Sequence, residues 1–276
     1  MKKTAVSLIS YDASYLAKSI KTYYKYVDEI ILGLDKDRIT WSNNSFSFDE
    51  KALWAELQEL DADNKISIIE ENFHKSAIAI ENDNYERNFL KKHATNDWII
   101  SIDADEQLLN AKEFFYDYCP LVEKYAKRAD VLMTWATPYK LIDETLLVIA
   151  NTDNTPFFGE NQGVLTHKNN TYTYARWTDI SAGGSNRLAS PLVAVHWSLC
   201  RDKADLHTKI HNIGHSDIVE KDPFYKIWDQ VTLDNYSNLH NFKSSGLGSA
   251  QWPKLHAIPL SAVEQYYTQN IGAAYQ

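Results

Sequence analysis

The chain has little cysteine, no excess of positive charge and no long hydrophobic run, and each absence excludes a class of protein. Cys119 and Cys200 are the only cysteines among 276 residues, too few for a disulfide framework or a CxxC metal site. We interpret both as buried free thiols, which fits a cytoplasmic protein. The 28 Lys and Arg against 37 Asp and Glu give a net charge of −9, which argues against a broad nucleic-acid or anionic-membrane surface. No apolar run approaches the roughly 20 residues of a membrane span, so we expect no integral membrane segment.

The first 110 residues alternate between strand and helix patterns. Short apolar runs predict strands, and apolar residues at helical spacing predict the helices between them. The predicted strands are residues 4–9, 29–34, 65–70 and 98–102, and the predicted helices are residues 13–26, 49–60 and 83–94. This βαβαβαβ order predicts an α/β fold with a mostly parallel sheet flanked by helices.

The pattern changes after residue 109, where the sequence predicts shorter strands, a small antiparallel extension and C-terminal helices. The strands are expected at residues 131–135, 146–149, 163–167, 171–176 and 191–197, and the helices at residues 113–127, 202–213 and 223–239. The alternation at residues 171–176 is typical of an antiparallel edge strand. We therefore expect a catalytic domain over residues 1–200 and a helical appendage over residues 201–276 that completes the acceptor side.

The strongest single signal is an acidic cluster directly after a buried strand. The apolar run of residues 98–102 ends abruptly in Asp103-Ala104-Asp105-Glu106. On a continuing strand, Asp103 and Asp105 would share a face. Open α/β sheets bind ligands beyond the carboxyl ends of their strands, and two carboxylates there suit Mg²⁺ or Mn²⁺ shared with substrate phosphates. The alternative is an acidic, solvated turn.

These residues bring the chain close to a known family. In four places it resembles the GT-A glycosyltransferases, and among them the bacterial family 2 enzymes. The four places are the turn Ser10-Tyr11-Asp12, the strand end at Asp35, the helix residues Glu86-Arg87-Asn88 followed by the acidic cluster, and Val195-His196-Trp197. The first three span about residues 1–110, and their order and spacing carry most of the resemblance.

The resemblance implies a role for each matching residue. Tyr11 and Asp35 would hold the base and ribose of a nucleotide-sugar, for which a UDP-sugar is the favoured candidate. Asp103 would contact the ribose and the divalent metal, and Asp105 would be the more direct metal ligand. His196 would complete the metal shell. In the same scheme, the guanidinium of Arg87 would face the nucleotide-sugar.

Family 2 enzymes mostly invert the sugar carbon and use a carboxylate to take the proton of the acceptor. The candidates for this base are Asp179, which follows an edge-strand pattern, and Glu160; we slightly favour Asp179. The acceptor stays open between a glycan, a protein, a small molecule and a modified nucleic-acid base. Because family 2 enzymes are often dimers, a homodimer is a further expectation by analogy.

Several of these residues also have a plain structural interpretation. Asp35 could be a turn residue at a strand end. Arg87 could be a surface partner of Glu86 or Asp83. His196 could be a satisfied core histidine.

Two other functions compete with the transferase. His207, His211 and His215 are spaced by four residues, so one helix face could present three imidazoles to Zn²⁺, as in a zinc-dependent hydrolase. No glutamate stands beside the first of them, so the H-E-x-x-H pattern is not met. The chain could also be a non-catalytic protein that binds a nucleotide-sugar.

Overall fold

The first half of the chain folds as the sequence predicts. A computed structural model describes residues 1–126, 128–179, 186–217, 219, 221–242 and 251–272. Strands and helices alternate along residues 3–101, as listed here: β1 (Lys3–Ile9), α1 (Ala13–Tyr23), β2 (Glu29–Asp35), α2 (Glu50–Leu60), β3 (Ile66–Glu71), α3 (Ala79–His93) and β4 (Trp98–Ser101). Asp49 caps α2 by accepting a hydrogen bond from the Ala52 backbone N–H at 2.9 Å.

The main sheet has eight strands in the order β3-β2-β1-β4-β9-β6-β12-β5. Its later strands are β5 (Glu106–Leu108), β6 (Ala129–Ala136), β9 (Glu160–His167) and β12 (Asn186–His196). Pairing is parallel from β3 to β4 and between β6 and β12, whereas β9 and β5 run in the opposite direction. Six strands therefore point the same way, and the predicted mostly parallel α/β sheet is confirmed.

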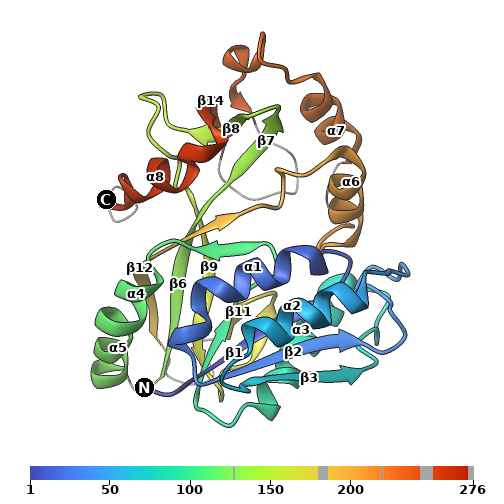
Figure 1. The fold of residues 1–276 in the computed structure, drawn as a ribbon, viewed down its shortest axis with the longest axis vertical. Coiled ribbons are helices and arrows are strands. Elements are labelled where there is room, and N and C mark those ends of the chain that lie inside the picture. The colour runs from blue at the N-terminus through green and yellow to red at the C-terminus, as the bar shows by residue number, and fades with distance from the viewer. Residues whose placement is uncertain (127, 180–185, 218, 220, 243–250, 273–276) are drawn as a thin grey trace.

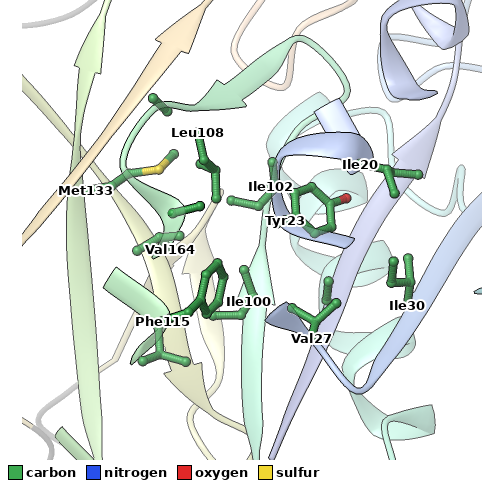
Figure 2. Packing of buried hydrophobic residues seen from close by; sticks show 14 of the residues in the cluster. Ile20, Tyr23, Val27, Ile30, Ile100, Ile102, Leu108, Phe115, Met133 and Val164 are labelled. Atoms are coloured by element: carbon green, nitrogen blue, oxygen red, sulfur yellow. The ribbon is translucent and has the colours of Figure 1, made fainter. Parts of the chain in front are cut away.

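Alternating side chains along β1 and β2 show how helices cover both faces of this sheet. Ala5, Ile9 and Ile30 belong to the cluster that contains the apolar residues of α1 and α2. Val6 and Ile31 belong to the cluster on the opposite face, which contains Leu90 of α3. Figure 2 shows the first cluster, in which the side chains of α1 meet those of β2 and β4.

Between β5 and β6 lies a helical segment made of α4 (Ala111–Glu113), a π-helical turn (Phe114–Tyr118) and α5 (Cys119–Tyr125). The strand expected at residues 171–176 forms a small separate ladder, in which β10 (Tyr172–Tyr174) pairs with β11 (Trp177–Thr178). This ladder contacts α3 through side chains of that helix: Asn88 Nδ2 donates to the Tyr172 carbonyl at 2.9 Å.

A second sheet of four antiparallel strands stands above the main sheet (Figure 1). Its order is β13 (His240–Phe242), β14 (Trp252–Pro259), β8 (Thr145–Ala150) and β7 (Pro138–Ile142). The C-terminal helices α6 (Lys203–Asn212), α7 (Lys221–Gln230) and α8 (Val263–Thr268) lie around it (Figure 1). The C-terminal region is thus partly β, because β14 pairs with β8 along six residues.

Two local differences from the predicted elements have clear causes. The helix expected at residues 223–239 ends at Gln230, because the Asn235 side chain accepts a hydrogen bond from the Thr232 N–H and forms a turn. No strand was expected at β14, since its buried residues Trp252, Leu255 and Ile258 recur every three positions instead of every two. No helix in the described part of the chain is long and apolar enough to cross a membrane.

Candidate active site

A pocket lies at the carboxyl ends of β1, β2 and β4, where the sheet geometry of α/β proteins places ligands. Tyr11, Asp35 and Asp103 reach it from these three strand ends. Its other walls come from α3, from β6, β9 and β12 of the main sheet, from Trp252 of the second sheet and from the C-terminal half of α6. Figure 1 shows α6 and α7 along one side of the molecule, linking the main sheet with the second sheet. The candidate residues in its lining are Tyr11, Asp35, Arg87, Asp103, Glu160, His196 and His215.

Asp103 and Asp105 have different environments, although the sequence placed them on one strand face. β4 ends at Ser101, so both aspartates belong to the following turn and the alternation of a strand no longer applies. The Asp103 side chain is 28% exposed and lines the pocket. The Asp105 side chain is fully buried.

The Asp105 carboxylate is bound by two cations that α6 and the preceding turn supply. Its Oδ2 accepts from Arg201 at 2.6 Å and lies 2.9 Å from Lys209 Nζ. Lys209 Nζ also lies 3.4 Å from Asp12 Oδ2. Burial opposes ionisation of Asp105, yet Lys209, His196 and Arg201 hold its pKa well below the usual range. Asp105 is therefore an anion at every ordinary pH.

Arg87 joins Asp103 to the body of α3. Its guanidinium donates to Asp103 Oδ1 at 2.9 Å, to Asp83 Oδ1 at 2.5 Å and to the Ser101 hydroxyl at 2.9 Å. Arg87 is thus a partner of Asp83, but the pair is buried and not on the surface as the structural interpretation has it, and Arg87 lines the pocket beside Asp103. Burial opposes ionisation of Asp103, but Arg87 and Arg176 hold its pKa far below the ordinary value.

Asp35 fits the interpretation as a turn residue better than a role in binding the nucleotide. Its Oδ1 accepts from the backbone N–H groups of Asp37 and Ile39 at 2.9 and 3.1 Å, and its Oδ2 accepts from Phe73 N–H at 2.7 Å. The carboxylate therefore accepts from two backbone N–H groups of the loop after β2 and from one just after β3, and so ties the two segments together. Tyr11 lines the pocket near Lys209, and its ring centroid lies 6.0 Å from Lys209 Nζ.

His196 is neither an ordinary core histidine nor a fully formed metal ligand. Its ring stacks on Trp135 with centroids 4.1 Å apart, and its Nε2 faces Asp105 Oδ1 at 3.7 Å. Burial lowers the pKa of His196, although Asp105 and Glu106 oppose the shift. The imidazole is therefore neutral near pH 7, which is the form that binds metal.

The Asp105–His196 pair fits two ligands of a divalent ion. Asp105 Oδ1 is buried and has no hydrogen-bond partner among the described residues, so one ligand atom is unused by the protein. Within that same part of the chain, no three His, Cys, Asp or Glu side chains are grouped to hold a metal ion. An ion here would complete its shell with phosphate oxygens and water, as Mg²⁺ commonly does.

The structure separates the two candidates for the catalytic base. Glu160 begins β9 and lines the pocket, and its Oε1 accepts a hydrogen bond from Trp252 Nε1 at 3.2 Å. Burial raises the pKa of Glu160, and the hydrogen bond from Trp252 opposes the shift. Asp179 follows β11, is exposed and is not among the described residues that line the pocket. The preference for Asp179 is thus not supported by its position.

The three histidines of the zinc hypothesis do not converge. α6 ends at Asn212, so His215 leaves the helical face and lines the pocket. His207 and His211 stack on each other with centroids 4.0 Å apart and on Tyr225 of α7. Because the helix ends before the third residue, the four-residue spacing does not bring three imidazoles to one ion.

Several pocket residues were missed from the sequence, above all the cations of the C-terminal half. Arg201, Asp205 and Lys209 are spaced by four residues, a signal for one helix face that could have been noticed. Nothing local indicates that Arg201 and Lys209 face Asp105, which is about 100 positions away in the chain. Arg176 is likewise buried, and its guanidinium contacts both carboxylate oxygens of Glu106, at 2.6 and 2.8 Å.

Comparison with known proteins does not assign the chain to a family. No protein-family model matches it, and no curated protein matches it. Among solved structures, residues 1–349 of S. aureus TarS share 15% identity over 61% of this chain and 47% of that one, with a TM-score of 0.36. A putative glucose-1-phosphate thymidylyltransferase from Bacillus anthracis shares 11% over 75% and 93%, with a TM-score of 0.39. The inositol-1-phosphate CTP transferase of T. maritima shares 8% over 78% and 96%, with a TM-score of 0.37.

The chain spans 22%, 47% and 51% of the length of the first three structures it matches. Since the TM-scores given above all lie below 0.5, these likenesses do not choose between enzyme classes. The basis for a function is therefore the pocket itself.

Proposed function

We propose that this chain is a GT-A-type glycosyltransferase that moves a sugar from a nucleotide-sugar, a UDP-sugar in the first instance, to an acceptor hydroxyl. The observation that carries the proposal is that Asp103 and His196 line the pocket where β4 ends, with Oδ1 of the buried Asp105 3.7 Å from His196 Nε2. Nucleotides bind at this edge of open α/β sheets. Polar groups for the diphosphate (Asp103, Lys209 and His196) and a carboxylate for the acceptor (Glu160) line the same pocket.

The diphosphate would lie near Asp103, Lys209 and His196. Lys209 reaches the pocket from α6, and its ammonium is held by Asp12 and Asp105. Asp103, which is the more exposed aspartate, would accept hydrogen bonds from ribose hydroxyls. An Mg²⁺ or Mn²⁺ ion held by Asp105 Oδ1 and His196 Nε2 would neutralise charge on the leaving diphosphate.

Glu160 is the residue that we propose as the base. Its carboxylate would take the proton of the acceptor hydroxyl while that oxygen bonds to the anomeric carbon. The bond from the anomeric carbon to the phosphate oxygen breaks in the same step, and its electron pair leaves with the nucleoside diphosphate. Attack from the face opposite the leaving group inverts the sugar carbon.

A second candidate function is non-catalytic binding of a nucleotide-sugar. It is favoured by the ion pairs of Asp105 with Arg201 and Lys209, because they commit one of its two oxygens to the protein. Both candidates predict binding, but only the transferase predicts turnover.

Release of UDP from a panel of UDP-sugars, with and without Mn²⁺, tests the proposal. The transferase hypothesis predicts that the protein slowly releases UDP by transferring the sugar to water. This release should stop in Glu160→Gln and continue in Asp179→Asn. Binding of UDP without release from any sugar, in the presence of a broad set of acceptors, would favour the binding protein. Release that is unchanged in Glu160→Gln would refute the assigned base.

A further inference from the structure

Glu86 is a buried carboxyl group of the pocket that the proposed reaction does not use. It lies on α3, is 5% exposed and lines the pocket near the end of β2. Its Oε2 accepts a hydrogen bond from Trp41 Nε1 at 2.7 Å. Its Oε1 accepts none among the described residues.

The backbone of β2 makes room for this carboxyl. A Cβ atom on Gly33 would lie 2.7 Å from Glu86 Oε1 and 2.5 Å from the side chain of Leu90. Any side chain at residue 33 would therefore push the carboxyl group out of its place. The glycine keeps Glu86 close to the strand end where Asp35 begins the next loop.

Glu86 has hydrogen-bonding capacity that Asp35 lacks. The Asp35 carboxylate already accepts from three backbone N–H groups. The neighbouring cation Arg87 is bound to Asp83, Ser101 and Asp103, and it makes no ion pair with Glu86 within the described part of the chain. A buried carboxyl without a cation is costly unless it is protonated or meets a ligand.

Protonation is the state that the surroundings favour. Burial raises the pKa of Glu86 to about 8, while the Trp41 hydrogen bond and Arg87 oppose the shift and Asp83 and Asp35 add to it. Of these groups, the charged ones are Arg87 and Asp83 on α3 and Asp35 at the end of β2. A protonated carboxyl presents an O–H donor beside a carbonyl acceptor.

We infer that Glu86 contacts the nucleobase, its O–H donating to a carbonyl oxygen of the base and its own carbonyl oxygen accepting from the adjacent N–H. Uracil offers such an edge at its N3–H and neighbouring carbonyl. The inference rests on the proposed function, since it requires that the pocket bind a nucleotide-sugar. It makes Glu86 a residue that binds the nucleobase of the donor, and leaves Asp35 as the residue that shapes the loop.

The amide of glutamine has the same donor and acceptor pattern as a protonated carboxyl but does not titrate. This gives the inference a sharp test by calorimetric titration of UDP, GDP, CDP and ADP at pH 6.5 and pH 9. We expect UDP to bind the wild-type protein more weakly at pH 9, by about tenfold for each pH unit above the pKa. Glu86→Gln should bind UDP as the wild type does at pH 6.5 and lose affinity less steeply than the wild type as the pH rises to 9.

Glu86→Ala should bind UDP at least about tenfold more weakly at pH 6.5, since it removes a buried hydrogen-bonding partner. Glu81→Gln, on an exposed position of the same helix, is the matched control and should behave as the wild type does. Melting curves without nucleotide establish that each variant is folded.

Three results would overturn the inference: a loss of affinity between pH 6.5 and pH 9 as large in Glu86→Gln as in the wild type, unchanged UDP binding in Glu86→Ala, or a preference for GDP that strengthens as the pH rises. The last would mean that an ionised carboxylate pairs with two donors. If no nucleotide binds the wild-type protein, the proposed function fails together with the inference; if UDP binds and Glu86 has no influence, only the inference fails.

Discussion

The two ends of the pocket hold carboxyl groups in opposite electrical states. At the β4 end, which we define by Asp103, Asp105 and Lys209, cations keep the aspartates ionised. At the β2 end, defined by Trp41 and Glu86, a carboxyl without a cation has its pKa raised to about 8. The difference shows that neighbouring cations, more than residue type, decide whether a buried acid acts as an anion or as a neutral donor.

The sharpest way to break the β4 end is Asp105→Ala. The substitution leaves Arg201 and Lys209 buried with less negative charge, and breaking a buried pair in this way costs about 3–5 kcal/mol. We expect urea unfolding to show a loss of this size, with Asp117→Ala on the exposed face of the segment before α5 as the control. A loss below about 1 kcal/mol would mean that these buried ion pairs contribute little to stability.

Glu160 and Asp179, both in the second half of the chain, are the two candidates for the catalytic base. Glu160→Gln should lower the rate of sugar transfer by about 10²- to 10⁴-fold, the usual contribution of a general base. Because burial raises the pKa of Glu160 and the base must be ionised, the rate should rise with pH through that pKa. Asp179→Asn should leave the rate within about twofold, and a larger fall than that of Glu160→Gln would reverse the assignment.

At the β2 end, Glu86→Gln should change the pH dependence of stability. The folded-state pKa is raised from 4.5 to about 8, so the folded protein holds more protons than the unfolded chain between these values. Stability from this group is therefore fully present below pH 4.5 and falls by about 1.4 kcal/mol for each pH unit up to the folded pKa. Thermal melts from pH 5 to pH 8 should show a shallower decline in Glu86→Gln than in the wild type; equal slopes would contradict the protonated state.

The smallest expected effect separates the two aspartates. Asp103→Asn should unfold close to the wild type, because Arg87 keeps its pair with Asp83. It should weaken UDP binding by about 10- to 100-fold, the range for lost hydrogen bonds to a charged group. Titration of UDP into both proteins measures this, and equal affinities would remove Asp103 from the site.

The sequence predicts the first half of the fold because its signals are local. Apolar runs define β1, β2 and β4, and the acidic turn after β4 marks the pocket edge correctly. The relation between Asp103 and Asp105 could not be predicted from strand alternation, since the strand ends two residues before the first of them.

The second half depends on contacts that no local pattern encodes. Lys209 meets Asp105 across about 100 residues, and β14 pairs with β8 across a similar distance. The regular spacing of His207, His211 and His215 was misleading for the converse reason, because a helix end intervenes. Most of the features that could not be predicted from the sequence therefore depend on contacts between residues far apart in the chain.

A thermal-shift panel tests most directly whether the pocket binds a nucleoside diphosphate at the β4 end. UDP, GDP, CDP and ADP would be added with and without Mn²⁺ to the wild type and to Asp103→Asn. A ligand that binds only the folded state raises the melting temperature. The proposal predicts that UDP with Mn²⁺ gives the largest rise and that Asp103→Asn reduces it; no rise with any nucleotide, with or without the metal, would contradict it.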